Sequence, residues 1–218
     1  MPADILHIFI SQQNGRLEKS RFDELAAAMP GTISKELYAY KKWEDAQASL
    51  AGKLLLKRFL QEQQLPFSLS DIQLQHKDRP FIDASFDFNI SHSGDYTVLA
   101  AAFQNKVGID IEKHRKLEPE MFRKYFSELE WQQIISPENP LKKFFHFWSV
   151  KEAAIKCDGR GVEVLGKTKT LDNKTVQCDT AVFHYSIIEI NENYSCAVCT
   201  EKEIGEIMVK RVSKLLSY

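Results

Sequence analysis

The sequence has few cysteines and no long apolar run, and each shortage excludes a class of protein. Its 218 residues include four cysteines, and only Cys196 and Cys199 lie close together, in a segment whose pattern predicts a buried strand. Residues three apart on a strand point to opposite faces, so this pair cannot chelate one metal ion, and core packing is the better interpretation. No apolar run approaches the roughly 20 residues of a membrane-spanning helix.

The sequence also lacks an excess of charge of either sign and an N-terminal export signal. Lys and Arg number 29 against 30 Asp and Glu, so net charge predicts neither a nucleic-acid nor a membrane partner, and an anionic ligand would need a local basic site. Residues 1–10 show neither a basic region nor a small-residue cleavage site, so we expect a cytoplasmic protein. With 44% hydrophobic and 27% charged residues, the composition is that of a globular protein.

Two stretches of the chain resemble halves of one plan. Each predicts a strand, a helix that contains a tryptophan, and then a pair of strands: residues 5–10, 34–60, 86–90 and 96–103 in the first half, and 107–112, 141–157, 184–191 and 194–200 in the second. We therefore expect an α+β fold of two similar α+β subdomains, residues 1–105 and 106–218, related by a pseudo-twofold axis. A ligand cleft between the halves and two independent packing modules are equally compatible with this pattern.

Two acidic residues share one face of the strand predicted at 107–112. Side chains alternate along a strand, so Asp110 and Glu112 lie side by side while Ile109 and Ile111 face the other way. Like charges at this spacing repel each other unless a cation lies between them, and Mg²⁺ needs only one or two protein carboxylates besides phosphate and water oxygens. Two solvated acids at a strand edge are the alternative, and this pair alone favours that alternative.

The predicted helix at 141–157 carries Glu152 and Lys156 on one face, because residues four apart stack on a helix. Gly159 is a natural residue for the end of this helix. The pair is either a surface ion pair worth a few tenths of a kcal/mol or a metal-proximal carboxylate beside a lysine that stabilises a charged phosphate leaving group. The helix alone does not decide between them.

A polar segment follows the strand predicted at 86–90. Ser91, His92 and Ser93 are expected in a turn, where two hydroxyls and an imidazole could hold a phosphate. Upstream, Lys77 and Arg79 offer cations in another turn, although a single arginine in a turn is usually solvated.

Taken in order, these segments resemble the Sfp-type 4′-phosphopantetheinyl transferase family over nearly the whole chain. The matching segments are Asp78–Pro80, Phe88–Ser93, Gly108–Glu112 and Trp148–Lys156, which correspond to the family's Gly-Lys-Pro, Asn-x-Ser-His-Ser, Gly-x-Asp-x-Glu and Trp-x-x-Lys-Glu-Ala-x-x-Lys motifs. Each motif is common alone, but the ordered set is highly specific.

The resemblance implies a monomer that binds coenzyme A between its halves, with Mg²⁺ on the pyrophosphate. The implied metal ligands are Asp110, Glu112 and Glu152, and the implied catalytic residues are Glu152 and Lys156. The implied coenzyme A-binding residues are Lys77, Arg79, Pro80, Ser91, His92, Ser93, Asp110, Lys151 and Lys156. Glu130 also matches a family glutamate, to which we assign no role.

Two positions depart from the family pattern. Arg79 stands where the family usually has lysine, and its fork-shaped group grips a phosphate differently. Ala48 stands where the family often has an arginine that contacts the nucleotide of coenzyme A. Lys41, Lys42 or Lys53 could substitute for that arginine.

The implied activity is transfer of the 4′-phosphopantetheine group from coenzyme A to a serine of an acyl, polyketide or peptidyl carrier protein, with release of 3′,5′-ADP. Glu152 is the first candidate to take the serine proton. Two alternatives stay open: a non-catalytic module that binds coenzyme A or a carrier protein, and a magnesium-dependent nucleotide phosphohydrolase.

A cationic stretch, Lys113–Leu117, directly follows the acidic strand. Met121, Phe122, Tyr125 and Phe126 come next, at a spacing typical of one side of a short helix. The stretch is either a docking surface for an acidic carrier helix or a set of solvated charges beside aromatic core residues, and the two interpretations carry equal weight.

Overall fold

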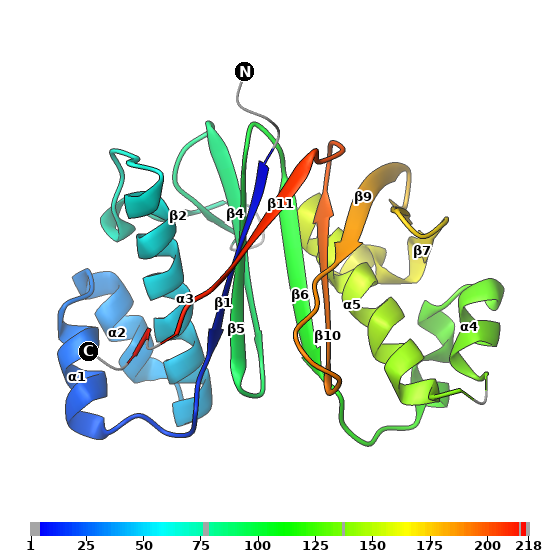
Figure 1. Cartoon of the computed structure of the whole chain (residues 1–218), viewed down its shortest axis with the longest axis horizontal. Coiled ribbons are helices and arrows are strands. Elements are labelled where there is room, and N and C mark those ends of the chain that lie inside the picture. The colour runs from blue at the N-terminus through cyan, green and yellow to red at the C-terminus, as the bar shows by residue number, and fades with distance from the viewer. Residues whose placement is uncertain (1–4, 76–78, 137, 214, 217–218) are drawn as a thin grey trace.

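The computed structural model describes residues 5–75, 79–136, 138–213 and 215–216. Two β-sheets lie back to back in the middle of the molecule, and helices cover the outer side of each (Figure 1). Both halves therefore combine a sheet with helices, which confirms the predicted α+β class with two subdomains.

The first sheet has four strands in the order β11-β1-β5-β4. Its strands are β1 (Ile5–Gln12), β4 (Phe86–Ser93), β5 (Tyr96–Phe103) and β11 (Glu206–Arg211). Three helices cover it: α1 (Lys19–Ala27), α2 (Gly31–Ala39) and α3 (Trp43–Glu62). A 3₁₀ turn (Leu69–Asp71) and the short strand pair β2 (Gln73–Leu74) and β3 (Pro80–Phe81) complete this half.

The second sheet has five strands in the order β6-β10-β9-β8-β7. Its strands are β6 (Val107–Lys113), β7 (Thr168–Thr170), β8 (Thr175–Cys178), β9 (Ala181–Ile187) and β10 (Tyr194–Thr200). Helices α4 (Glu128–Ile134) and α5 (Pro140–Asp158) lie outside it, with 3₁₀ turns at Pro119–Tyr125 and Val162–Lys167.

The C-terminal strand crosses between the halves. β11 pairs in parallel with β1, with Ile5 opposite Glu206 and Ile10 opposite Arg211, and its path across the centre of the molecule is visible in Figure 1. The last strand of the chain thus completes the sheet of the first half. The boundary between the two subdomains, 1–105 and 106–218, stays a prediction.

Alternation along the strands produces separate hydrophobic cores on the two faces of each sheet. Ile8 and Val98 point to the space between the sheets, where Ile109 and Val198 of the second sheet meet them. On the opposite face of the first sheet, Phe9, Leu99 and Phe88 pack against α3. Cys196 joins the core between the sheets and Cys199 the core under α5, and both thiols are free and buried, which confirms their predicted packing role.

The two sheets are joined along β4 and β6 by side chains instead of backbone carbonyls. Four side chains of β4 each accept a hydrogen bond from a backbone N–H of β6, always twenty residues further along the chain: Asp87 from Val107 (2.9 Å), Asn89 from Ile109 (2.9 Å), Ser91 from Ile111 (3.4 Å) and Ser93 from Lys113 (3.0 Å). We call this set the β4–β6 ladder. It satisfies N–H groups that would otherwise be unpaired along the edge of the second sheet.

Three predicted elements have different limits in the structure. The helix predicted at 34–60 is two helices, because Tyr40 and Lys42 are extended and α2 folds back to bury Ile33 in the same core as α3. Tertiary packing thus overrides helix propensity here. The strand predicted at 184–191 is β9, which ends at Ile187.

The third difference concerns Ser91, His92 and Ser93. They do not lie in a turn, because β4 continues through Ser93 and the hairpin reverses at Gly94. The turn prediction was therefore wrong, and the ladder accounts for the longer strand, since Ser91 and Ser93 bond to β6.

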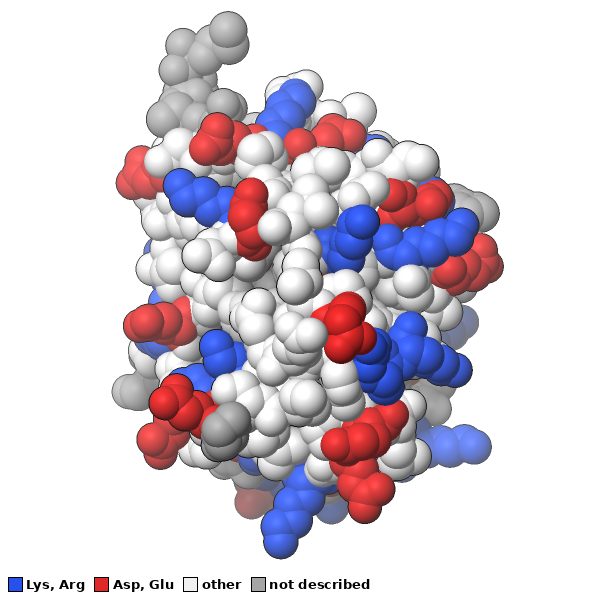
Figure 2. All heavy atoms as spheres, turned by 90° about the vertical axis from the view of Figure 1, so that its right-hand side faces the viewer, with Lys and Arg blue, Asp and Glu red and all other residues white. Residues whose placement is uncertain are grey.

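The surface carries charges of both signs. On the side of the molecule that bears the second half, Figure 2 shows acidic and basic side chains interspersed, in line with the nearly balanced composition. Among the described residues, none of the helices is both long enough and apolar enough to cross a membrane.

Gly108 sets how closely β6 approaches α5, and its replacement tests that contact. A Cβ at this position would stand 2.1 Å from the carbonyl oxygen of Ala153 and 2.3 Å from the amide nitrogen of Cys157. We expect Gly108→Ala to lower the free energy of unfolding by about 3 kcal/mol, because backbone atoms have to move. Chemical denaturation measures this loss. Gly166→Ala, where a Cβ meets nothing within 4 Å, is the control, and equal stability of the two variants would contradict the close contact.

Candidate active site

A cluster of polar side chains lies where β4, β6 and α5 meet. The Lys156 ammonium donates to Asp110 Oδ1 at 2.6 Å, to Ser91 Oγ at 3.1 Å and to the Ile109 carbonyl at 3.2 Å. The Ser91 hydroxyl also donates to Asp110 Oδ1 at 3.1 Å. Three residues from three sequence motifs are therefore in direct contact, in line with the common site that the family resemblance implies.

One oxygen of this cluster has no partner. Asp110 is buried, and its Oδ2 atom accepts no hydrogen bond in the part of the chain that the structure describes. A buried carboxylate oxygen without a partner is costly, because it has lost its hydration. Such an atom marks a position at which a cation or a donor of a ligand would be stabilised.

Two further carboxylates add negative charge around Asp110. Burial and the charge of Asp110 raise the pKa of Glu112, although the nearby Arg115, 3.1 Å away, opposes the shift. Burial and the charges of Asp110 and Glu112 likewise raise the pKa of Glu152, against the influence of Lys156. The charge of Asp110 thus lies close enough to both glutamates to disfavour their ionisation.

These carboxylates do not form a ready-made metal cage. Among the described residues, no group of three or more His, Cys, Asp and Glu side chains is arranged to hold a metal ion. A cation here would therefore need further ligands besides the protein.

A cavity of about 230 Å³ opens beside the cluster. Glu152 and Lys156 line it from α5, and Pro80 and Asn89 line it from the first half. A small part of a ligand can therefore reach Lys156 and Glu152 together, from a space that both halves enclose.

The other β4 residues of the predicted site divide between the two faces of the strand. Ser93 lies on the ladder face, where its hydroxyl accepts from the Lys113 N–H. His92 is exposed and points to the opposite face, where it interacts electrostatically with Asp45 of α3. The three residues do not converge on one point, because neighbours on a strand face opposite ways. Lys77 lies outside the described residues.

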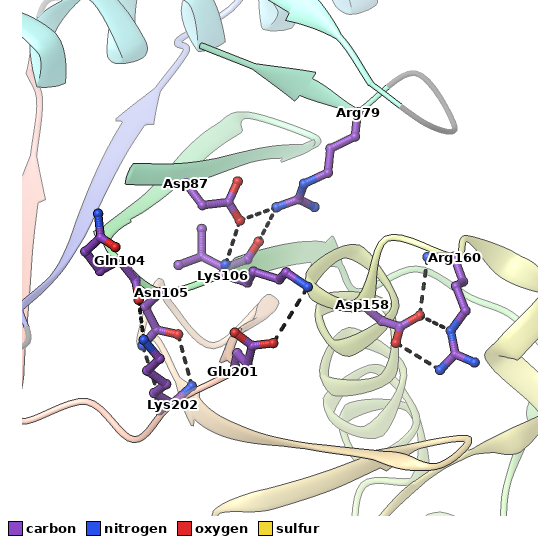
Figure 3. Close-up of polar contacts among 10 residues, drawn as sticks. Arg79, Asp87, Gln104, Asn105, Lys106, Asp158, Arg160, Glu201 and Lys202 are labelled. Carbon is purple, nitrogen blue, oxygen red and sulfur yellow. Dashed lines mark hydrogen bonds and ion pairs between the residues drawn. The ribbon is translucent and has the colours of Figure 1, made fainter. Parts of the chain in front are cut away.

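Arg79 lies inside the junction of the two halves. Its guanidinium donates to Asp87 at 2.5 Å (Figure 3), to the Val107 carbonyl at 2.8 Å and to the carbonyl of Lys156. Only 17% of its side chain is exposed. All of these contacts are with the protein itself.

The structure does not bring Lys151 to the cluster. Its ammonium is completely buried, 3.0 Å from Glu130, and donates to the carbonyl of Thr168. Burial lowers the pKa of Lys151, while the charge of Glu130 opposes that shift. Lys151 and Glu130 thus form a buried ion pair between α5 and α4.

Glu130 has a structural role that sequence reasoning left unassigned. Its carboxylate accepts from the Ser127 N–H at 2.8 Å, which closes a capping box at the start of α4, and from the Thr170 N–H at 2.9 Å. Burial raises the pKa of Glu130, but Lys151 and these hydrogen bonds outweigh it, so the pKa lies below its usual range. The Ser-x-x-Glu pattern at residues 127–130 is a sequence signal for this cap.

The departure at Ala48 leaves a buried methyl group. Ala48 is 6% exposed and lies in α3. Of the cations considered as substitutes, Lys53 lies 3.8 Å from Glu36, and Lys41 and Lys42 are exposed. Their role in binding a nucleotide stays a prediction.

Two family models match consecutive parts of the chain. The 4′-phosphopantetheinyl transferase superfamily model matches residues 106–203, which include β6 and α5. The model of the N-terminal part of 4′-phosphopantetheinyl transferases matches residues 16–104. The two matches meet where the first sheet passes to the second.

Curated relatives agree with these models. The 4′-phosphopantetheinyl transferase Sfp of Bacillus subtilis is 32% identical over 166 residues, 73% of this chain and 72% of the relative. The transferase gsp of Aneurinibacillus migulanus is 26% identical over 204 residues, 88% and 84% of the two chains. The L-aminoadipate-semialdehyde dehydrogenase-phosphopantetheinyl transferase of Xenopus laevis is 36% identical over 137 residues, but the match covers only 45% of its length.

We call Ser91, Asp110, Glu112, Glu152 and Lys156 the junction cluster. Together with these matches, it defines the class of protein: the chain belongs to the 4′-phosphopantetheinyl transferase superfamily. It is an enzyme of that class. This result confirms the resemblance read from the ordered motifs.

The buried pair of Lys151 and Glu130 gives a test of their roles. We expect Lys151→Met and Glu130→Gln each to lower the free energy of unfolding by about 3–5 kcal/mol, because each leaves a buried group without its partner. The double variant should lose less than the sum of the two. Chemical denaturation of the four proteins measures both effects. If Lys151 contacts phosphate instead, Lys151→Met would keep its stability and lose coenzyme A affinity.

Proposed function

We propose that the junction cluster transfers the 4′-phosphopantetheine group of coenzyme A to a serine of a carrier protein and releases 3′,5′-ADP. The observation that carries this proposal is the contact of Lys156 with Asp110, whose second oxygen is buried without a partner. The family acts on carrier proteins with coenzyme A. The assignment of each step to particular residues is our own.

The donor set fits Mg²⁺. Asp110 offers a buried oxygen without a partner among the described residues, and Glu112 and Glu152 add carboxylates whose pKa is raised by burial and by the charge of Asp110, so a positive charge nearby would stabilise their ionised forms. Mg²⁺ uses one or two protein carboxylates together with phosphate oxygens and water, so the lack of a complete protein cage is compatible with it. When bound, the ion would neutralise charge on the pyrophosphate.

The protein's own groups supply the rest of the chemistry. Lys156 lies where it can balance negative charge on the departing phosphate, and Glu152 lines the same cavity, where it can accept the proton of the attacking serine. Catalysis of this kind consists mainly of positioning and charge stabilisation and needs no covalent enzyme intermediate. The predicted coenzyme A-binding set stays a prediction, and its members are Lys77, Arg79, Pro80, Ser91, His92, Ser93, Asp110, Lys151 and Lys156. The burial of Lys151 in its pair with Glu130 makes it the weakest candidate of the set. The cytoplasmic location and the monomeric state also stay predictions.

One assay separates the proposal from its two alternatives. Mass spectrometry follows a carrier protein incubated with enzyme, Mg²⁺ and coenzyme A. A transferase adds phosphopantetheine to the carrier, a phosphohydrolase releases free phosphopantetheine without an acceptor, and a binding module does neither.

Replacement of the acidic residues tests the metal assignment. We expect Asp110→Asn and Glu152→Gln each to reduce transfer by roughly a hundredfold or more, because ligand charge is lost while side-chain volume is kept. Mass spectrometry of the carrier measures the rate at increasing Mg²⁺, and Ca²⁺ should substitute poorly because it prefers longer bonds and more ligands. Glu206→Gln, at an exposed position of β11, is the control. Full activity of Asp110→Asn at ordinary Mg²⁺ would contradict the assignment.

The structure divides the residues of the predicted docking surface. Phe122, Tyr125 and Phe126 pack against the core of α5, whereas Met121 is 73% exposed. Arg115 bonds to Glu112 at 3.1 Å, so its reversal would also disturb the acidic cluster. Lys116 is exposed. Lys113 and Arg115 of the predicted docking surface are exposed as well.

Charge reversal at Lys116 tests docking without a direct change at Glu112. We expect Lys116→Glu to raise the apparent KM for the carrier roughly three- to tenfold at low ionic strength and to flatten its salt dependence, since exposed charges act mainly on association. The KM for coenzyme A should not change. Lys169→Glu, at an exposed position of β7, is the control, and an unchanged carrier KM in Lys116→Glu would place the docking surface elsewhere.

A further inference from the structure

Arg79 connects three elements through one guanidinium group. Its acceptors are the Asp87 carboxylate on β4 (Figure 3), the Val107 carbonyl at the start of β6 and the Lys156 carbonyl in α5. The planar fork of arginine presents several donors in fixed directions, whereas a lysine ammonium is a single point charge. The geometry of these acceptors therefore requires arginine at this position.

Asp87 contributes to the same junction from the other side. Its Oδ2 atom accepts from Arg79 at 2.5 Å and from the Val107 N–H at 2.9 Å, which is the first rung of the β4–β6 ladder. Both side chains are largely buried, with 17% and 19% exposed. The charge of Arg79 is thus compensated within the protein. The same carboxylate of Asp87 bonds to Arg79 and forms the first rung of the ladder.

The Lys156 carbonyl is the contact that links this pair to catalysis. The last carbonyls of a helix have no partner within the helix. At the end of α5, Gly159 has a φ of 83°, and its N–H donates to the carbonyl of Ile155 at 2.9 Å. The guanidinium of Arg79 donates to the carbonyl of Lys156. Glu152 lies one turn earlier on this helix, and Lys156 belongs to its last turn. The position of this turn decides where the Lys156 ammonium meets Asp110.

We propose that Arg79 and Asp87 are positioning residues that hold the last turn of α5 against β4 and β6, so that Lys156 reaches Asp110. This proposal rests on the proposed function. It differs from the expectation that Arg79 grips a phosphate of coenzyme A, because its guanidinium is engaged by Asp87 and two backbone carbonyls. Its effect on the reaction passes through Lys156.

A neighbouring ion pair supplies a matched control. A cavity of about 500 Å³ is lined by Arg79 and Asp87 and also by Lys106 and Glu201, and the last two form their own ion pair at 3.6 Å (Figure 3). That pair is half exposed, and among the described residues its two side chains form no hydrogen bond or ion pair with Lys156 or with the side chains of the ladder. A variant that breaks the ion pair of Lys106 and Glu201 changes the charge beside the same cavity and leaves the contact of Arg79 with α5 in place.

The test compares Arg79→Lys, Asp87→Asn and the double variant with Glu201→Gln. We expect each single variant to lower kcat roughly tenfold with the KM for coenzyme A unchanged, and the double variant to be no worse than the poorer single one, because the two residues act as a unit. Glu201→Gln should keep the kcat of the unchanged protein. Assays well below each variant's unfolding temperature, checked by thermal denaturation, separate a loss of positioning from a loss of fold.

Hydrogen exchange gives a readout that does not depend on transfer. In Arg79→Lys and Asp87→Asn, the amides of Gly159 and Arg160 should exchange roughly tenfold faster, while those of β5 keep their rates. If exchange responds in this way but the unchanged protein transfers no phosphopantetheine, the proposed function is wrong, and Arg79 and Asp87 still hold the last turn of α5.

The opposite pattern would overturn the proposal. If Arg79→Lys keeps kcat, Arg79→Ala raises only the KM for coenzyme A and Asp87→Asn has no effect, then Arg79 binds phosphate by charge. Unchanged exchange at Gly159 in both single variants would equally show that the pair does not hold α5.

Discussion

The β4–β6 ladder is the interaction on which the arrangement of the two halves depends. Both strands lie at edges of their sheets, and an edge strand exposes backbone groups that need partners. β4 does not offer its own carbonyls to β6. Short polar side chains at alternate positions reach across instead and accept four N–H groups. The sheets can therefore remain separate, each with its own helices, while they stay in a fixed register.

This register also builds the site. Ser91 is a rung of the ladder, and its hydroxyl contacts both Asp110 and Lys156. A shift of one residue along β4 would turn its polar side chains toward α3 and its phenylalanines toward β6, since side chains alternate. The same residues thus hold the halves together and align the proposed catalytic groups. The polar residues of β4 consequently serve the packing of the two sheets and the contacts of the candidate site at once.

The limits of prediction from sequence follow the range of the interactions involved. The strand at 194–200, the αL cap at Gly159 and the shared face of Asp110 and Glu112 depend on local alternation and turn chemistry, and the structure has all three. The break between α2 and α3 has no Gly or Pro signal, because packing of α2 on α3 causes it. The pairing of Lys151 with Glu130 joins residues 21 positions apart. Lys151 and Glu152 are consecutive residues of one helix, and helical periodicity alone does not reveal which of them faces the core.

The energetics of the junction explain why the fold supports such a polar centre. Two cations, Lys156 and Arg115, face three carboxylates there. The Oδ2 atom of Asp110 is buried without a partner among the described residues. Left to itself, this arrangement destabilises the protein. Hydrophobic cores lie on both faces of β6, with Ile109 toward the other sheet and Ala153 of α5 on the opposite side, and hold its backbone in place. Gly108 lets α5 approach closely. The scaffold therefore fixes negative charge at a position where a cation would compensate it, and a site of this kind is preorganised because its cost is met before any ligand arrives.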